Sequence, residues 1–188
     1  VRQAMGNKAT DNAGYFLTTL FPSNQLSIMD YNRVVKDLNG LSANEFLQKL
    51  ESTFSIEKKD KAYRPENLHD FGLFLENQWY KLRAKPGTYN NDPIGILDIS
   101  ILQEHVLSPI LGIHDQRTDK RIDFVGGIRG LEELEKRVNS GEMKLAISLF
   151  PVSIEQLFNI ADSGNVMPPK STWFEPKLRD GLLTHMID

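Results

Sequence analysis

Residues 121–161 read RIDFVGGIRGLEELEKRVNSGEMKLAISLFPVSIEQLFNIA, and they place a strand, a helix, a strand and a helix in succession. Ile122–Val125 is predicted to be the first strand, and Leu131, Leu134 and Val138 then recur at helical spacing in a helix that Gly141 can terminate. Met143–Leu149 alternates apolar with polar or small side chains, which predicts a half-buried strand. Ser153-Ile154-Glu155-Gln156 has the form of a capping box. The segment is therefore predicted to be β-α-β-α, and its second helix is expected to face the core with Ile154, Leu157, Phe158 and Ala161.

A hairpin is predicted upstream of this segment. Phe71–Leu75 and Trp79–Arg83 carry alternating large residues on the two sides of Glu76-Asn77-Gln78. Two such runs separated by a few polar residues are typical of antiparallel strands joined by a short turn. We expect a β-hairpin with a three-residue connection.

Two further helices are expected. Ser42-Ala43-Asn44-Glu45 is a second capping box. The apolar stripe after it consists of Phe46, Leu47, Leu50 and Phe54. Ile94–Leu111 also carries apolar residues at helical spacing, and Pro109 closes it. These patterns predict one short capped helix and one longer amphipathic helix.

Three terminal segments resemble strands by residue type. They are Tyr15–Phe21, which is rich in aromatic and β-branched residues, Leu26–Asp30 and Leu182–Ile187. Val1–Asp11 instead reads as a helix tail followed by a polar loop, so we expect the natural protein to begin further upstream. The alternating charges of Glu57-Lys58-Lys59-Asp60-Lys61 are interpreted as a solvated loop.

These elements predict an α+β fold in which helices pack on a mixed or antiparallel sheet. A chain of 188 residues with 40% hydrophobic residues can bury one sizeable core. We expect residues 1–188 to form a single C-terminal domain of a larger protein, with residues 1–115 and 116–188 as possible lobes.

Composition narrows the function classes. The net charge of -3 lacks the basic excess of most nucleic-acid-binding proteins, so nucleic acid is an unlikely partner. No cysteine occurs, which removes thiolate nucleophiles and thiolate metal sites and fits a reducing, cytoplasmic location. The apolar runs fall far short of the roughly 20 residues that a membrane span needs, so we expect no membrane partner.

The turn Gly126-Gly127-Ile128-Arg129-Gly130 is one candidate anion site. It joins a strand to a helix start, where free N–H groups can hold a phosphate and Arg129 would add charge. However, Glu132 and Glu133 crowd the first helical turn and would repel an anion. We favour a structural glycine turn and keep Gly126, Gly127 and Arg129 as weaker candidates.

The stronger candidate is the MPPKST loop, Met167–Thr172. Read from Gly164 it nearly spells a phosphate-binding loop, but Pro169 stands where the second glycine belongs and lacks the N–H that the cradle needs. What remains is an ammonium group and two hydroxyls, at Lys170, Ser171 and Thr172, presented after two rigid prolines. The loop could bind a polar or phosphorylated ligand, or it could be a crossover with a solvated lysine. Lys177 is a weaker candidate nearby.

Two other groups of polar residues leave alternatives open. Asn32-Arg33-Val34 would place a buried arginine near a site, or Arg33 would pair with Asp37 for structural reasons. The four histidines show no metal-ligand spacing, and His114-Asp115 with Asp119 is better interpreted as a polar turn than as a metal site. No metal site is predicted.

Three stretches of this sequence resemble a family of uncharacterised bacterial proteins known as domain-of-unknown-function family 1015. They are Met29–Leu41, Ile122–Gly127 and Val166–Gly181, and the Met-Pro-Pro-Lys-Ser-Thr segment is the most specific. The resemblance runs across nearly the whole chain. It implies an N-terminal half, absent here, that ends near an Ala-Asp-Gly-His-His-Arg motif. That motif is similar to the partition-protein and sulfiredoxin-like fold shared by some ADP-dependent free-serine kinases, and the family's genes often neighbour serine-biosynthesis genes.

The resemblance implies three hypotheses for the whole protein. The first is a small-molecule enzyme, most concretely a kinase for free serine or a similar amino acid, with a nucleotide or pyrophosphate and a divalent metal as cofactors. Lys170 would neutralise phosphate oxygens, the hydroxyls of Ser171 and Thr172 would orient phosphate or metal, and Arg33 would be a second cation. The second is a non-catalytic metabolite-binding module, and the third is a nucleic-acid-associated protein. In each case the missing N-terminal half is the expected partner, and this fragment alone is expected to be inactive.

Overall fold

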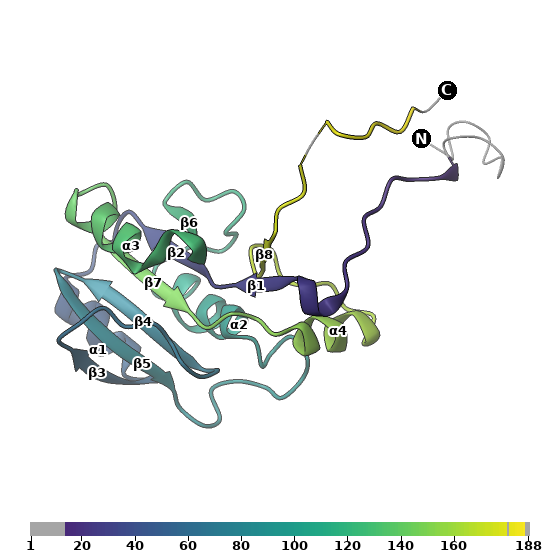
Figure 1. The fold of residues 1–188 in the computed structure, drawn as a ribbon. Coiled ribbons are helices and arrows are strands. Elements are labelled where there is room, and N and C mark those ends of the chain that lie inside the picture. Colours follow the sequence, from purple (N-terminus) through teal and green to yellow (C-terminus); the bar gives the residue numbers. More distant parts are fainter. Residues whose placement is uncertain (1–13, 180, 187–188) are drawn as a thin grey trace. The chain divides into compact units, whose positions relative to one another are not determined.

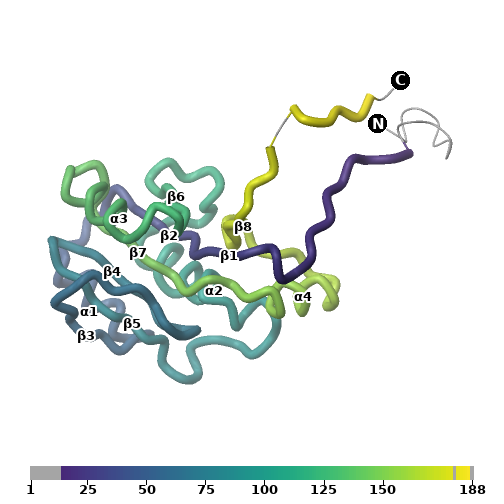
Figure 2. Tube along the Cα trace, in the orientation of Figure 1, coloured from purple at the N-terminus to yellow at the C-terminus, as the bar shows by residue number. Residues whose placement is uncertain are grey.

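A computed structural model describes residues 14–179 and 181–186 of the chain. It divides into two compact units, residues 28–173 and a smaller one formed by residues 1–27 with 174–188. The core and most of the predicted site residues belong to the larger unit. Its chain path can be followed in Figure 2.

The larger unit is built on a six-stranded sheet in which every neighbouring pair is antiparallel (Figure 1). In spatial order its strands are β3 (Phe54–Lys59), β5 (Gln78–Ala84), β4 (Asp70–Leu75), β7 (Leu145–Leu149), β2 (Tyr31–Val35) and β6 (Ile122–Gly126). The α+β class is confirmed, and the sheet is antiparallel. β2, which carries Asn32 and Arg33, lies between β7 and the edge strand β6.

The predicted hairpin is confirmed as β4 and β5, but its connection is shorter than expected. Leu75 pairs with Gln78, so only Glu76 and Asn77 form the turn. Both have positive φ, 49° and 58°, which is the backbone of the two-residue turn that matches strand twist. Asparagine tolerates this conformation well, so Asn77 in the connection could have indicated a two-residue turn.

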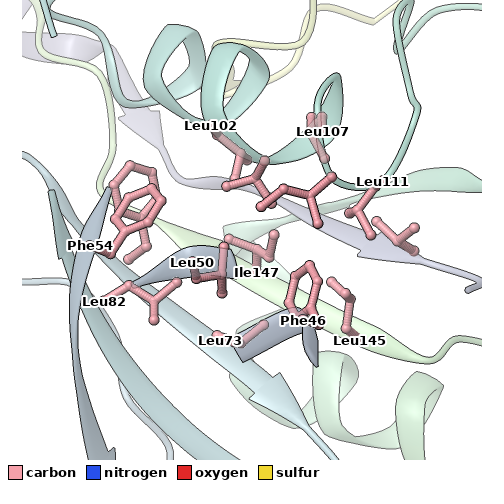
Figure 3. Close-up of a cluster of buried hydrophobic side chains, with 14 of the residues drawn as sticks. Phe46, Leu50, Phe54, Leu73, Leu82, Leu102, Leu107, Leu111, Leu145 and Ile147 are labelled. Atoms are coloured by element: carbon pink, nitrogen blue, oxygen red, sulfur yellow. The ribbon is translucent and has the colours of Figure 1, made fainter. Parts of the chain in front are cut away.

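Helices cover both faces of the sheet. α1 (Ala43–Leu50) and α2 (Asp98–Leu102) contribute to the main core, where Phe46, Leu50 and Leu102 meet sheet residues such as Leu73 and Ile147 (Figure 3). α3 (Gly130–Asn139) packs on the other face through Leu134, beside Val34 and Phe74. The capping box of α1 is formed by Ser42 and Glu45 as predicted. Phe54, expected on this helix, instead begins β3 and is buried.

The single amphipathic helix predicted over Ile94–Leu111 is wrong in its form. α2 ends at Leu102, and Gln103–Leu107 continues as a π-helix, followed by turns. The apolar spacing is still used for burial, since Leu102, Val106 and Leu107 are all in the core. Periodicity could not reveal the switch in hydrogen-bond pattern, because it changes the backbone more than the buried face.

α4 (Ile154–Asp162) has the predicted capping box between Ser153 and Gln156. Its expected core face is wrong. Ile160 is the buried residue, whereas Phe158 is 54% exposed and Ala161 is exposed. Ile160 packs on Leu97 and Ile99, so a short contact with the start of α2 determines its orientation.

Three strand predictions also need correction. β7 is buried at all five positions and not half-buried, because α1 and α2 cover one face and α3 the other. Glu57, Lys58 and Lys59 are not in a loop but in the edge strand β3, where charged side chains are common. Tyr15–Phe21 is not a strand, and neither is Leu182–Met186; Ile187 lies outside the described residues, as does Val1–Asp11.

The remaining elements are short. η2 (Ser23–Gln25) and η4 (Gly127–Arg129) are single 3-10 turns. β1 (Ser27–Met29), predicted as Leu26–Asp30, and β8 (Trp173–Glu175) form a two-stranded sheet. Among the described residues, no helix has the length and apolar content to cross a membrane.

Candidate functional site

The MPPKST loop has an unusual backbone at its lysine. Lys170 adopts φ 60°, a left-handed conformation that costs energy for a residue with a Cβ. Two hydrogen bonds hold it, one from Ser171 Oγ to Pro168 O and one from Arg33 Nη2 to Lys170 O at 2.7 Å. Ser171 is buried and Thr172 half-buried, while Lys170 is exposed. The structure thus brings Arg33 and the loop together, which is one of the two alternatives that the sequence left open.

Arg33 lies under the loop and not in solvent. Only 1% of its surface is exposed. Nε donates to Gln116 Oε1 at 3.2 Å, Nη1 to Tyr31 O and Nη2 to Lys170 O. Phe124 and Tyr31 rings flank the guanidinium at 5.4 and 6.0 Å. Burial lowers the pKa of Arg33 to about 9.

The alternative pairing of Arg33 with Asp37 is not seen. Asp37 Oδ1 lies 3.5 Å from Arg121 instead. Every acceptor found for Arg33 in the described residues is a neutral oxygen. In this structure Arg33 is a positioning residue for the loop, and a direct ligand contact by it stays a prediction.

A polar concavity of about 520 Å³ lies next to the loop. Its lining comes from α2 and the π-helix, from the turn after Ile113, and from the two prolines of the loop. The lining residues are Ile99, Ser100, Gln103, Glu104, His114, Asp115, Gln116, Arg117, Pro168 and Pro169. This volume falls within the range of small-molecule sites in proteins.

A chain of hydrogen bonds joins Arg33 to the walls of the concavity. Gln116 accepts from Arg33 and donates from Nε2 to Gln103 Oε1 at 2.8 Å. Gln103 Nε2 in turn donates to Ile113 O at 2.9 Å. One buried guanidinium therefore fixes the relative positions of the loop, the turn and the π-helix.

The charged groups of the concavity are Glu104, Asp115 and Arg117. Arg117 Nε and Nη2 donate to the two oxygens of Asp115 at 3.0 and 2.9 Å, and its backbone N–H also donates to Asp115. These hydrogen bonds lower the pKa of Asp115 to about 2. Asp115 thus orients the guanidinium of Arg117. For Glu104, no hydrogen bond or ion pair is found among the described residues.

The π-helix carries two of the lining residues, Gln103 and Glu104. π-turns within α-helices are uncommon and are frequent at functional sites, because the extra residue per turn reorients side chains. His114 also lines the concavity, with Nδ1 2.8 Å from Ser108 Oγ. The backbone irregularity thus coincides with the polar lining.

The lysine of the loop is directed to an aromatic ring. Lys170 Nζ lies 5.3 Å from the centroid of Phe124, and no carboxylate pairs with it in the part of the chain that the structure describes. Trp173 packs against Tyr31, with the two ring centroids 5.3 Å apart. The ammonium group stays exposed at the edge of the site, where a ligand phosphate could reach it.

The glycine turn has a packing role in this structure. A Cβ at Gly126 would lie 2.7 Å from the Trp173 ring, and one at Gly127 would lie 2.1 Å from Asp30 Oδ1. Gly127 N also donates to Asp30 O at 2.7 Å. Arg129 is exposed. These contacts support the structural interpretation that the sequence favoured.

The other weaker candidates are Asn32 and Lys177. Asn32 is fully buried, where it donates to Asp30 Oδ2 at 2.6 Å and accepts from Leu149 N at 3.0 Å. Lys177 belongs to the smaller unit, in which it lines an apolar groove with Phe21, Leu26 and Phe174. Among the described residues no group of His, Asp and Glu side chains has the arrangement of a metal site.

Sequence reasoning missed most of the concavity. Gln103, Glu104, Gln116 and Arg117 were not candidates, since each is a common surface residue in an ordinary-looking segment. Only the run His114-Asp115 drew attention, as a polar turn. These lining residues come together through the π-helix and the hydrogen bonds of Arg33, and no local sequence pattern reveals either feature.

Comparison with protein families gives one match. The model described as "Protein of unknown function (DUF1015)" matches residues 1–100. The chain belongs to this family. The matched part of this DUF1015 protein contains β2 and the start of α2, and the MPPKST loop lies beyond it. A comparison with curated proteins gives no significant match.

Solved structures share the fold of this DUF1015 chain. A free serine kinase in complex with AMP matches with TM-score 0.50 and 13% identity, over 81% of this chain and 55% of that chain. A substituted free serine kinase in complex with AMP gives 0.50 and 14%, with the same coverage. A conserved hypothetical protein from Pyrococcus furiosus gives 0.49 and 17%, over 80% and 56%. The chain therefore spans little more than half the length of these proteins.

Proposed function

We propose that this chain is part of a small-molecule phosphotransferase that acts on free serine or a related amino acid. In this proposal the polar concavity holds the acceptor, and Lys170 at its edge neutralises charge on the transferring phosphate. A nucleotide or pyrophosphate with a divalent metal would be the donor. We assign its binding, and the catalytic base, to the remainder of the protein, which would work in the cytoplasm.

The observation that carries the proposal is the Arg33 clamp. A buried guanidinium holds the MPPKST loop, including a lysine in a strained backbone conformation, against a concavity of small-molecule size. Strain of this kind persists where the surroundings over-determine it, and it clusters at functional sites. A merely solvated crossover would need neither the clamp nor the strain.

The shared fold adds support of a different kind. The solved neighbours are described as free serine kinases in complex with AMP, and phosphoryl transfer to serine needs a small polar site for the amino acid. Fold likeness at 13–14% identity does not carry activity, so the proposal depends on the site.

The test uses the longer protein that contains this chain. Thermal unfolding is measured with ADP, ATP, pyrophosphate and each of a panel of amino acids, with Mg²⁺ present. Any pair that raises the unfolding temperature is then assayed for a phosphorylated product by mass spectrometry. We expect a phosphorylated amino acid; binding without turnover would instead select a metabolite-sensing module, and neither binding nor turnover would refute the proposal.

The same assay on the 188-residue chain alone provides a second check. We expect no turnover, because this proposal assigns the binding of the phosphate donor and the catalytic base to the rest of the protein. A robust rate from this chain would contradict the assignment of catalysis to the rest of the protein.

A further inference from the structure

The polar concavity has an unusual charge pattern for a site in a phosphoryl-transfer protein. Two carboxylates, Glu104 and Asp115, line it with one guanidinium, Arg117. Nucleotide and pyrophosphate sites instead gather cations and N–H donors, because each phosphate brings negative charge. A phosphate chain placed here would meet an excess of carboxylates, so the donor is excluded from this concavity.

The carboxylates of Asp115 and Glu104 differ in their partners. Asp115 is occupied by Arg117, which it holds by two side-chain hydrogen bonds of 3.0 and 2.9 Å. Glu104 is exposed and no hydrogen bond or ion pair to it is found within the described residues. The concavity therefore presents one oriented cation and one available anion.

Arg117 keeps donors for a ligand. A guanidinium has five N–H groups, and the pair with Asp115 uses one on Nε and one on Nη2. Nη1 and the second N–H of Nη2 remain, on one edge of the planar group. That edge matches the two oxygens of a carboxylate, which arginine binds in this geometry.

We infer that this concavity binds the zwitterion of a free α-amino acid, with Arg117 receiving its carboxylate and Glu104 its ammonium group. Neutral polar residues, Ser100, Gln103 and Gln116, complete the polar part of the lining. The inference rests on the proposed function for the choice of serine as the first ligand. It deepens that proposal by assigning the acceptor's recognition to residues of this chain.

The test compares serine with two analogues in the longer protein, by calorimetric titration without any phosphate donor. Serinamide lacks the carboxylate, and 3-hydroxypropanoate lacks the ammonium group. We expect the wild-type protein to bind serine about tenfold or more tightly than either analogue.

Two variants then assign each contact. Arg117→Met is expected to weaken serine binding about tenfold while leaving serinamide unchanged. Glu104→Gln is expected to weaken serine binding while leaving 3-hydroxypropanoate unchanged. Because both ligands are measured on the same variant, loss of folded protein would affect both equally. Lys144→Met and Glu66→Gln, exposed and away from the lining, serve as matched controls.

The outcomes separate this inference from the proposed function. If serine binds more tightly than both analogues but no phosphate donor gives a phosphorylated product, the result would support the zwitterion site and refute the phosphotransferase. If the wild-type protein phosphorylates serine but Arg117→Met and Glu104→Gln bind serine as the control variants do, the result would support the phosphotransferase and overturn the zwitterion site. Equal weakening of serine and serinamide by an Arg117→Met protein that unfolds at the wild-type temperature would also overturn it, and so would failure of the wild-type protein to bind any α-amino acid.

Discussion

Asp70 in β4 and Arg33 in β2 are charged side chains buried in one sheet, and they are compensated in different ways. Asp70 is fully buried and has Lys81 Nζ at 3.0 Å and Arg83 Nη1 at 2.9 Å. Arg33 is as deeply buried, but it donates only to neutral oxygens of Tyr31, Gln116 and Lys170. No carboxylate pairs with it among the residues that the structure describes.

The difference indicates what each charge is for. The charge of a buried carboxylate with two cationic partners is fully compensated, and such a group can serve the hairpin alone. An unpaired guanidinium destabilises the fold, so its retention suggests a role in the loop and the concavity that it joins. The comparison therefore separates a structural ion pair from a positioning charge.

A third buried ionisable side chain, Asp98, extends the comparison, because its effect on stability depends on pH. Its Oδ1 accepts from His69 N at 2.9 Å, Oδ2 has no hydrogen-bond partner in the described structure, and burial raises its pKa to about 8. Between about pH 4 and 8 the folded state thus holds a proton that the unfolded state has lost. This group's contribution to stability is full below pH 4 and falls as pH rises to 8, by up to about 1.4 kcal/mol per unit.

The Asp98→Asn variant should lack this dependence. Urea unfolding of both proteins at pH 5 and pH 8 measures it: the stability of the wild type relative to the variant should fall by a few kcal/mol between the two pH values. Equal changes in both proteins would mean that Asp98 is ionised in the folded state.

Removal of the guanidinium is the next largest expected effect. Arg33→Met keeps an unbranched apolar stem but leaves one buried and two partly buried acceptors without their donor, at about 1–3 kcal/mol for a fully buried one and less for the others. Loss of the unpaired charge offsets part of this. We expect a net loss of about 2–4 kcal/mol in urea unfolding, and an unchanged midpoint would show that the clamp contributes nothing.

Asp70→Asn should cost less, about 1–2 kcal/mol, although Asp70 has the better partners. The side chains of Lys81 and Arg83 are 24% and 54% exposed, so both can turn to water when the carboxylate is removed. Glu76→Gln, which removes the exposed pair with Lys144, is the control and should change stability by less than about 0.5 kcal/mol. A larger loss for Asp70→Asn than for Arg33→Met would reverse the comparison.

Much of the fold could be predicted because its signals are local. The capping boxes at Ser42 and Ser153 and the hairpin around Asn77 each depend on a few adjacent residues. The strand predicted at Tyr15–Phe21 failed because residue preference alone does not supply a hydrogen-bonded neighbour. The core face of α4 failed for a similar reason, since its contact with Leu97 and Ile99 is set by tertiary packing.

The candidate site also has a part that local sequence signals predict and a part that they do not. Lys170 and Ser171 could be singled out because prolines and polar residues are adjacent in the chain, and Arg33 because it stands among strand residues. The walls could not, because Gln103, Gln116 and Arg117 converge only through the π-helix and the long-range hydrogen bonds to Arg33. Sequence patterns thus located one edge of the site.

The strained backbone at Lys170 predicts a smaller change in stability, and this change is a gain where the variants of Arg33 and Asp70 give a loss. Glycine adopts a positive φ without a Cβ clash, so Lys170→Gly should stabilise the chain by up to about 1 kcal/mol. The same variant should lose ligand affinity, because it removes the ammonium group. Differential scanning calorimetry of the variant against the wild type measures the first effect, and a lowered unfolding temperature would mean that the backbone at Lys170 is not strained.

The most direct test of the loop as a functional element is Lys170→Met in the longer protein. Lys170 is exposed and no carboxylate pairs with it in the described structure, so the variant should keep its unfolding free energy within about 0.5 kcal/mol. Its turnover on the phosphate donor and amino acid identified for the wild type should fall at least about tenfold. Strong destabilisation with normal activity per folded molecule would contradict the account and make the loop structural.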